Sequence, residues 1–327
     1  MSDKPLVSIL IPCYNHENFL DDCLSSILAQ TYDNIELLIC DDCSPDRSFE
    51  KITDYEQRLK KRFSRVVIMR NDVNQGVTKN INRMLKLAQG VFVKTIASDD
   101  AMAPTAIAQM TQYLIAHPQI DVVVSNGIKV SESEQYPNFT PIEKIYSAAP
   151  DFRSDGFFAR VAACNPISAP AAMVRMSVYD KYGYYDEQVK VEDYEFWLRI
   201  LKDGCVQFGF LDENLLYYRL NANSMTSLTG NAGLARRRKL IHESEMDTLA
   251  KYRDCLAPAD YAIIATQRMM AERWLAVEYQ LIDWEKELAD RWHKFSDKKY
   301  LPLKNRISVR LFYLRQWLKQ CIYRSRD

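Results

Sequence analysis

The stretch Ile35-Glu36-Leu37-Leu38-Ile39-Cys40-Asp41-Asp42-Cys43-Ser44 is the most informative for the fold. It is an apolar run that ends in two acidic residues. Residues 35–40 predict a buried strand, and a second apolar run, Val91–Ala97, leads in the same way to Asp99 and Asp100. Like charges gathered at strand ends repel one another and raise one another's pKa values. A divalent cation or a phosphate-bearing ligand removes that cost. The pattern therefore predicts a metal-dependent site for a nucleotide or its sugar conjugate.

Strand and helix patterns alternate along the first 125 residues. The predicted strands are Leu6–Cys13, Ile35–Cys40, Arg65–Met69, Val91–Ala97 and Ile120–Ser125. The predicted helices are Glu17–Ala29, Asp46–Arg62, Val77–Gln89 and Pro104–Ala116. This alternation predicts an α/β fold with a mostly parallel central sheet flanked by helices. Ligands bind at the carboxyl ends of the strands in such sheets, which is where both acidic pairs fall.

The next hundred residues are less regular. Ser131–Asp155 is polar and interrupted by proline, which predicts an irregular excursion. A third acidic pair, Glu192-Asp193, stands at the start of a helix predicted over Asp193–Lys202. Short strands are predicted over Val206–Phe210 and Leu215–Arg219.

The C-terminal third has a different character. Three long helical patterns with few breakers follow one another, over Asn231–Leu256, Ala259–Phe295 and Arg306–Arg324. We therefore predict a nucleotide-sugar-binding and catalytic domain over residues 1–228 and a C-terminal helical extension over residues 229–327.

Composition and charge exclude several classes of protein. Lys and Arg together number 43, as do Asp and Glu, so the overall charge gives no case for binding nucleic acid. No stretch approaches the roughly 20 apolar residues of a spanning helix. The N-terminus predicts a strand and no secretion signal. We expect a cytoplasmic protein, or one bound peripherally at the inner face of the cell membrane.

The tail is basic, with seven Lys or Arg residues and one Asp in residues 301–327. Its helical pattern places an apolar stripe along one side, formed by Ile307, Leu311, Leu314, Leu318 and Ile322. Such a helix can lie in an anionic membrane interface, and it can equally pack on the preceding helices or on a second copy of the chain. The sequence leaves these alternatives open.

Several short motifs occur in a fixed order over residues 5–225. They are Val7–Asn15, Ser26–Tyr32, Asp41–Ser44, Asn74–Gly76, Ala88–Gly90, Ser98–Asp100, Gly183–Glu187 and Glu192–Arg199. Together they resemble the inverting family-2 glycosyltransferases with the GT-A fold, of the kind that builds bacterial surface polysaccharides. Two positions depart from that family, which often has Asp where this chain has Ala97 and Arg where it has Ile81.

The resemblance implies a nucleotide site on the first motifs. It assigns Asp42 to the uracil imide and Asp41 to the same site, although either carboxylate could instead cap the following helix. It places Cys13 and Tyr14 in the wall of the nucleotide pocket, with the Pro12 backbone at the base, and it assigns Asn82 to the nucleotide as well.

The resemblance also implies the catalytic residues. Asp99 would hold Mg²⁺ or Mn²⁺, with Asp100 as a second ligand or a ribose or sugar contact. Asp193 would be the base that removes the proton from the acceptor hydroxyl, although a carboxylate there also complements the helix dipole. Arg219 would belong to a loop that closes over the diphosphate, or it would simply end a strand.

These assignments predict a glycosyltransferase that moves a sugar from a UDP-sugar to a hydroxyl of a saccharide, with lipid-linked saccharides among the candidate acceptors. The reaction would invert C1, depend on metal and serve polysaccharide, lipopolysaccharide or capsule biosynthesis. One alternative is a sugar-1-phosphate nucleotidyltransferase, although Pro12–His16 is not the Gly- and basic-rich loop such enzymes use. The other alternative is a non-catalytic subunit that binds nucleotide-sugars.

Overall fold

The computed structural model of the chain describes residues 4–152, 156–221 and 232–278. The predicted domain boundary at residue 228 lies outside these ranges, as does the basic tail helix Arg306–Arg324.

Four parallel strands form the N-terminal half of the sheet, in the order β3-β2-β1-β4. They are β1 (Val7–Cys13), β2 (Ile35–Asp41), β3 (Arg65–Arg70) and β4 (Phe92–Thr95). Val7 pairs with Ile35 on one side and with Phe92 on the other. Almost every residue of β1 and β2 is buried, which explains why their sequences are continuously apolar rather than alternating.

Five further strands complete the sheet. They are β5 (Ala101–Met102), β6 (Val122–Ser131), β7 (Glu143–Lys144), β8 (Ala172–Arg175) and β9 (Phe208–Leu220). The order continues from β4 through β8, β6 and β9 to β5, with β7 paired to β6. β6 and β9 run in the same direction as β1–β4, whereas β5, β7 and β8 run against it. The predicted α/β fold with a mostly parallel sheet is confirmed.

One strand prediction was wrong. The two short strands expected over Val206–Phe210 and Leu215–Arg219 are the single strand β9. Its pairing with β6 shifts register around Asn126, and this irregularity accommodates the polar residues 212–214 without breaking the strand. A polar interruption within one strand therefore resembles a turn between two strands when only the sequence is considered.

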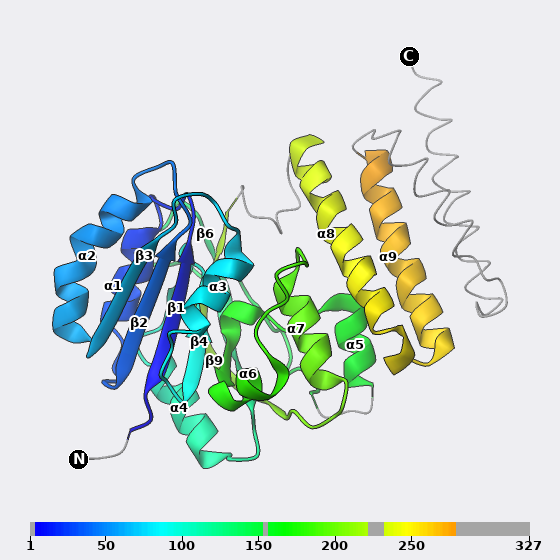
Figure 1. The fold of residues 1–327 in the computed structure, drawn as a ribbon, viewed down its shortest axis with the longest axis horizontal. Coiled ribbons are helices and arrows are strands. Elements are labelled where there is room, and N and C mark those ends of the chain that lie inside the picture. The colour runs from blue at the N-terminus through cyan, green and yellow to red at the C-terminus, as the bar shows by residue number, and fades with distance from the viewer. Residues whose placement is uncertain (1–3, 153–155, 222–231, 279–327) are drawn as a thin grey trace. The chain divides into compact units, whose positions relative to one another are not determined.

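Helices cover both faces of the sheet (Figure 1). On one face the β1 side chains Val7, Ile9 and Ile11 share a core with α1 (Leu20–Leu28), α2 (Ser48–Arg62) and α4 (Ala106–Ala116). Helix α3 (Val77–Leu85) contacts β1 and β2, and its side chains lie outside that core, on the other face. Successive strand residues point to opposite faces, so this arrangement requires both halves of β1 to be apolar.

The remaining helices follow β6 in the chain. They are α5 (Phe157–Cys164), α6 (Met176–Tyr182), α7 (Glu192–Leu201), α8 (Ala232–Lys251), α9 (Pro258–Glu278) and the 3-10 turns η1 (Ala169–Ala171) and η2 (Arg253–Cys255). Aromatic contacts hold α6 and α7 together, since the Tyr179 ring stacks on Phe196 with centroids 5.1 Å apart. The Tyr194 hydroxyl joins α7 to α5 by donating to the Ala162 carbonyl at 2.7 Å.

The chain divides into two compact units, residues 1–245 and 246–327. The first holds the sheet, helices α1–α7 and the beginning of α8, and the second holds the rest of α8 together with η2 and α9. Among the helices of the described ranges, none is long and apolar enough to cross a membrane.

A buried carboxylate fixes the turn between α3 and β4. Glu36 is fully buried and accepts hydrogen bonds from the backbone N–H groups of Gln89 and Gly90, and Arg65 pairs with its other oxygen. The Gly90 N–H also reaches the Ser8 hydroxyl at 2.8 Å. Because these bonds hold residues 89 and 90, α3 ends at Leu85, short of the predicted end at Gln89.

This turn predicts that Gly90→Ala destabilises the fold. A Cβ at residue 90 would lie 2.5 Å from the Ser8 hydroxyl and 2.6 Å from the Ser8 backbone nitrogen, so either the turn or the central strand β1 must shift. We expect a loss of about 1–3 kcal/mol in the free energy of unfolding, measured by urea denaturation. Gly156→Ala is the control, because its nearest atom would lie 4.0 Å away. Equal stability of the two variants would contradict the prediction.

Candidate active site

Two loops meet at the carboxyl ends of β1 and β2. Each contains a residue in the left-handed region, Asn15 with φ 57° and Cys43 with φ 59°. The Asn15 N–H donates to the Ser44 hydroxyl at 3.0 Å, and the Asp42 N–H donates to the Cys13 carbonyl at 2.8 Å. These bonds join the two loops into one cradle, in which the Tyr14 side chain is 46% exposed.

Asp42 holds the loop that begins α3. Its carboxylate accepts from the Asn71 side chain at 2.8 Å, from the Gln75 N–H at 2.7 Å and from the Gly76 N–H at 2.8 Å. The alternative that Asp42 caps the helix after β2 is not what the structure shows, since α2 has no side-chain cap. An ionised carboxylate has about four acceptor sites, so one remains for a further donor such as an imide N–H.

Asp41 and Asn82 have mainly protein partners. Asp41 is fully buried, and one of its oxygens accepts from the Ser44 N–H at 3.1 Å while the other has no partner among the described residues. The Asn82 amide donates to the Tyr185 carbonyl at 2.9 Å and accepts from the Tyr185 N–H at 3.0 Å. Asn82 thereby joins α3 to the segment before α7.

The acidic loop after β4 contains one partly exposed and one buried carboxylate. Asp99 lies 3.9 Å from the His16 ring, whose other nitrogen is 2.8 Å from the Ser98 hydroxyl. Asp100 is buried and accepts from the Arg219 N–H at 2.9 Å, and its second oxygen has no partner among the described residues. Burial, with the Asp99 charge second, raises the pKa of Asp100 well above its usual range.

The chemistry of this loop fits a hard divalent cation. Carboxylate oxygens are the ligands that Mg²⁺ and Mn²⁺ prefer, and Asp100 offers an oxygen to which no described residue donates. Within residues 4–152, 156–221 and 232–278, no group of three or more His, Cys, Asp or Glu side chains is arranged to hold a metal alone. A cation at Asp99 and Asp100 would therefore complete its ligands with substrate oxygens and water.

Arg219 holds the acidic loop through hydrogen bonds from its buried side chain. Its guanidinium is buried and donates to the Asp99 carbonyl at 2.9 Å, to the Glu134 carbonyl at 2.7 Å and to the Asp22 carboxylate at 2.6 Å. A direct contact with a diphosphate would require the guanidinium to leave these partners. Asp22 was not singled out in the sequence, because its partner lies 197 residues away on another element.

A buried lysine lies close to the same loop. Lys94, on β4, donates to the carbonyls of Pro170 and Ala172, the latter at 3.3 Å. Burial lowers the pKa of Lys94 to about 7, and the nearby Asp100 charge opposes that shift. The sequence analysis missed Lys94 because a single lysine within an apolar strand carries no motif.

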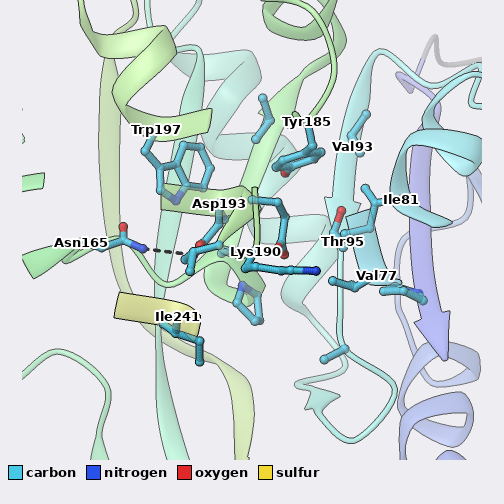
Figure 2. A pocket seen from close by; sticks show the side chains of 18 of the residues that line it. Val77, Ile81, Val93, Thr95, Asn165, Tyr185, Lys190, Asp193, Trp197 and Ile241 are labelled. Carbon is cyan, nitrogen blue, oxygen red and sulfur yellow. Dashed lines mark hydrogen bonds between the residues drawn. The ribbon is translucent and has the colours of Figure 1, made fainter. Parts of the chain in front are cut away.

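A cavity of about 440 Å³ lies between the sheet and α7 (Figure 2). Pro12 and Ala97 line it from the ends of β1 and β4, and Glu192 and Asp193 line it from the first turn of α7. Its size is typical of a site for a small molecule. Asp41, Asp42, Asp99 and Asp100 are not among its lining residues, although Ala97 stands only two positions before Asp99.

Asp193 is held in one orientation within this cavity. One oxygen accepts from the Asn165 side chain at 3.2 Å, drawn as a dashed line in Figure 2, and the other accepts from the Tyr194 N–H at 2.7 Å. Burial raises the pKa of Asp193 to about 6, and the charge of Glu245 on α8 adds to the shift. Burial and the Asp193 charge raise the pKa of Glu192 to about 7. A proton acceptor with a pKa near neutrality suits general-base catalysis.

Comparison with known proteins places the chain in a family. A family model described as Glycosyl transferase family 2 matches residues 8–183. The chain belongs to glycosyltransferase family 2. Among its relatives, the Escherichia coli protein named UDP-Glc:alpha-D-GlcNAc-diphosphoundecaprenol beta-1,3-glucosyltransferase WfaP is 30% identical over 227 residues, covering 68% of this chain and 80% of WfaP.

Solved structures support the same fold for this family-2 glycosyltransferase. The S. aureus TarS fragment 1–349 in complex with UDP-GlcNAc has a TM-score of 0.55 at 15% identity, covering 88% of this chain and 92% of that one. The mannosyltransferase PcManGT from Pyrobaculum calidifontis, in complex with GDP-Man and Mn²⁺, also has a TM-score of 0.55 at 15% identity, covering 90% and 76%. Both are GT-A-like neighbours, which confirms the predicted fold class.

The raised pKa values predict a pH-dependent gain of stability in Asp193→Asn. The native state of the wild type keeps protons on Asp193 and Glu192 that the unfolded chain releases near their ordinary values of 3.8 and 4.5. Wild-type stability therefore falls as pH rises from about 4 to about 7. The Asn variant lacks one of these charges, so we expect it to be more stable than wild type by about 1–3 kcal/mol near pH 8 and by much less near pH 4. Melting temperatures at the two pH values test this.

The opposite result would favour the helix dipole. A carboxylate in the first turn of α7 stabilises that helix by about 0.3–1 kcal/mol. If Asp193→Asn is less stable than wild type near pH 8, the dipole outweighs the cost of burying the charge.

Proposed function

We propose that this family-2 glycosyltransferase takes a sugar from a UDP-sugar and passes it, with inversion at C1, to a hydroxyl of a saccharide acceptor. One observation carries the proposal. A single cavity is lined by Asp193 on α7 and by Pro12 and Ala97 at the strand ends that lead into the predicted nucleotide and metal loops. An acceptor hydroxyl in this cavity would lie between a proton acceptor and the proposed donor site.

The chain's own residues would perform a single displacement. Asp193 takes the proton of the acceptor hydroxyl as that oxygen attacks C1, and the UDP leaves from the opposite face of the sugar. Asn165 holds the Asp193 carboxylate in place through its 3.2 Å hydrogen bond. Mg²⁺ or Mn²⁺ held through Asp99, with Asp100 as the second carboxylate, would supply positive charge to the departing diphosphate.

The nucleotide would bind in the cradle of the first two loops. Asp42 retains an acceptor site for the uracil imide, and the exposed Tyr14 forms part of the wall. Pro12 supplies backbone at the base, and Asp41 lies beside Cys13 in the sheet. We propose that Asn82 and Arg219 support this site through the segments they anchor. TarS was solved with UDP-GlcNAc and PcManGT with GDP-Man, so neighbours with this fold differ in both the nucleotide and the sugar of the donor. Binding measurements with individual nucleotide-sugars would identify the donor of this chain.

The acceptor is proposed to be a saccharide on a lipid carrier, in the synthesis of a surface polysaccharide. The name of WfaP gives such an acceptor, a GlcNAc-diphosphoundecaprenol. The C-terminal helices would mediate either contact with the cytoplasmic face of an anionic membrane or formation of a homo-oligomer. The basic tail of this helical extension lies outside the described residues. Family membership favours glycosyl transfer over the nucleotidyltransferase alternative. A measurement of sugar transfer distinguishes an enzyme from the alternative, a non-catalytic subunit that binds nucleotide-sugars.

UDP binding should depend on metal through the acidic loop. We expect UDP with Mn²⁺ to raise the melting temperature more than UDP with EDTA, since ligand at 100 times its dissociation constant adds about 2.7 kcal/mol. Asp99→Ala should remove most of the metal-dependent part. Asp54→Asn, an exposed change on α2, is the control. Equal stabilisation with and without metal would remove Asp99 from the proposed site.

Asp193→Asn should strongly reduce turnover without weakening the binding of UDP. The amide keeps the shape but cannot take a proton, so we expect kcat to fall by about 10²–10⁴ with UDP affinity within a few-fold. In the wild type, kcat/KM should rise as pH increases through about 6, the raised pKa of Asp193. Transfer is measured by release of UDP and by mass spectrometry of the glycosylated product. Near-normal transfer by the variant would rule out Asp193 as the base.

A further inference from the structure

The cavity contains a buried hydrogen-bond donor that no described residue satisfies. Trp197 is 1% exposed, lines the cavity, and its indole N–H has no partner among the described residues. The Asn165 side-chain oxygen, also in the cavity lining, lacks a partner there as well. A buried donor left unpaired destabilises the protein, and an oxygen atom of a bound ligand would remove that cost.

Above about pH 7, the raised pKa of Glu192, the charges around the same cavity are mostly negative. Glu192, Asp193 and Glu245 line it, and Lys190 is the one cationic side chain in the lining that the structure describes. Figure 2 shows Lys190, Asp193 and Trp197 around one space. Like charges brought together in a desolvated site repel each other strongly. A carboxylate or phosphate group on a ligand would therefore be disfavoured here, whereas hydroxyl groups can donate to the carboxylates.

Apolar side chains form much of the remaining wall. Val93, Ala172 and Val174 contribute from the sheet, and Ile241 contributes from α8. Such surfaces suit the C–H faces of a sugar ring and give nothing to a charged group.

Helix α8 supplies part of this wall from beyond the matched family region, which ends at residue 183. Ile241 and Glu245 line the cavity, and the Ser244 hydroxyl accepts from the Lys190 N–H at 2.8 Å. All lining residues belong to the unit 1–245. The wall is therefore a feature of this chain in addition to its family motifs.

We propose that the cavity takes an uncharged acceptor sugar, with the Trp197 indole donating to one of its oxygens and with Glu192 and Glu245 excluding acidic sugars. The proposal rests on the proposed function and names the chemical class of its acceptor. Any anionic carrier attached to that sugar would lie outside the cavity.

Three matched probes test whether the cavity excludes acidic sugars. They are methyl glucoside, methyl glucuronide and the neutral amide of methyl glucuronide. The first two differ at C6 alone, where one carries a hydroxymethyl group and the other a carboxylate. Binding to the full chain in the presence of UDP and Mn²⁺ is measured by saturation-transfer NMR. We expect the glucuronide to bind at least about tenfold more weakly than the glucoside, and the amide to recover most of the difference.

Variants test which residues exclude acidic sugars. Glu192→Gln and Glu245→Gln, alone and together, should reduce the difference in affinity between the glucuronide and the glucoside. Glu243→Gln should leave it unchanged, because Glu243 lies on the same helix, pairs with Lys239 and is outside the cavity lining. Trp197→Phe keeps an aromatic ring but loses the donor, so it should weaken glucoside binding by about 3–10-fold. A melting curve and UDP binding check that each variant is folded.

The outcomes are distinguishable. Glucuronide binding as strong as glucoside binding, or an unchanged gap in the Glu192 and Glu245 variants, would overturn the inference. Binding of none of the probes while UDP still binds would overturn it too, and would leave the proposed donor chemistry standing. Absence of UDP binding in the wild type would instead overturn the proposed function, and the inference with it.

Discussion

Repulsion between carboxylates at the carboxyl ends of parallel strands is the constraint on which the site depends. Parallel strands end at one edge of the sheet, so Asp41 and Asp42 after β2 and Asp99 and Asp100 after β4 gather at that edge. The protein offsets most of this cost with donors. Asp42 receives three hydrogen bonds, and Arg219 serves the Asp99–Asp100 loop through its backbone and its guanidinium. One oxygen of Asp100 has no partner within the described part of the chain, which marks where the compensation is incomplete.

A different balance holds at the start of α7. Glu192 and Asp193 receive few donors, and burial raises the pKa values of both. Asp42 accepts three hydrogen bonds and positions a loop, whereas Asp193 is half-buried, accepts hydrogen bonds from Asn165 and Tyr194, and keeps a raised proton affinity. The number of donors and the degree of burial therefore distinguish these two aspartates. Asn165 gives Asp193 an orientation without removing that proton affinity.

Local pattern accounts for the elements that sequence analysis predicted. The limits predicted for β1, β2 and β3 agree with the structure within one or two residues. β1 and β2 are nearly continuous apolar runs because they are buried on both faces, whereas most residues of β3 are half-buried. Helices α5 and α6 and strand β8 were not predicted. β8 is only four residues long and lies between antiparallel partners that are distant in the sequence, so no local periodicity marks it. The single strand β9 likewise depends on its pairing with β6, which absorbs the polar residues 212–214.

The sequence by itself determined the α/β class, the family and the acidic residues at the strand ends, because apolar periodicity and short motifs are local properties of a chain. Tertiary structure alone decided which partners those residues have. It turned Arg219 inward to Asp22 across 197 residues, and it brought Glu245 to the cavity that holds Asp193. It also buried the Trp197 indole where none of the described residues accepts its hydrogen bond. The physical reason is that burial and hydrogen-bond geometry depend on contacts between distant segments, which no local pattern records.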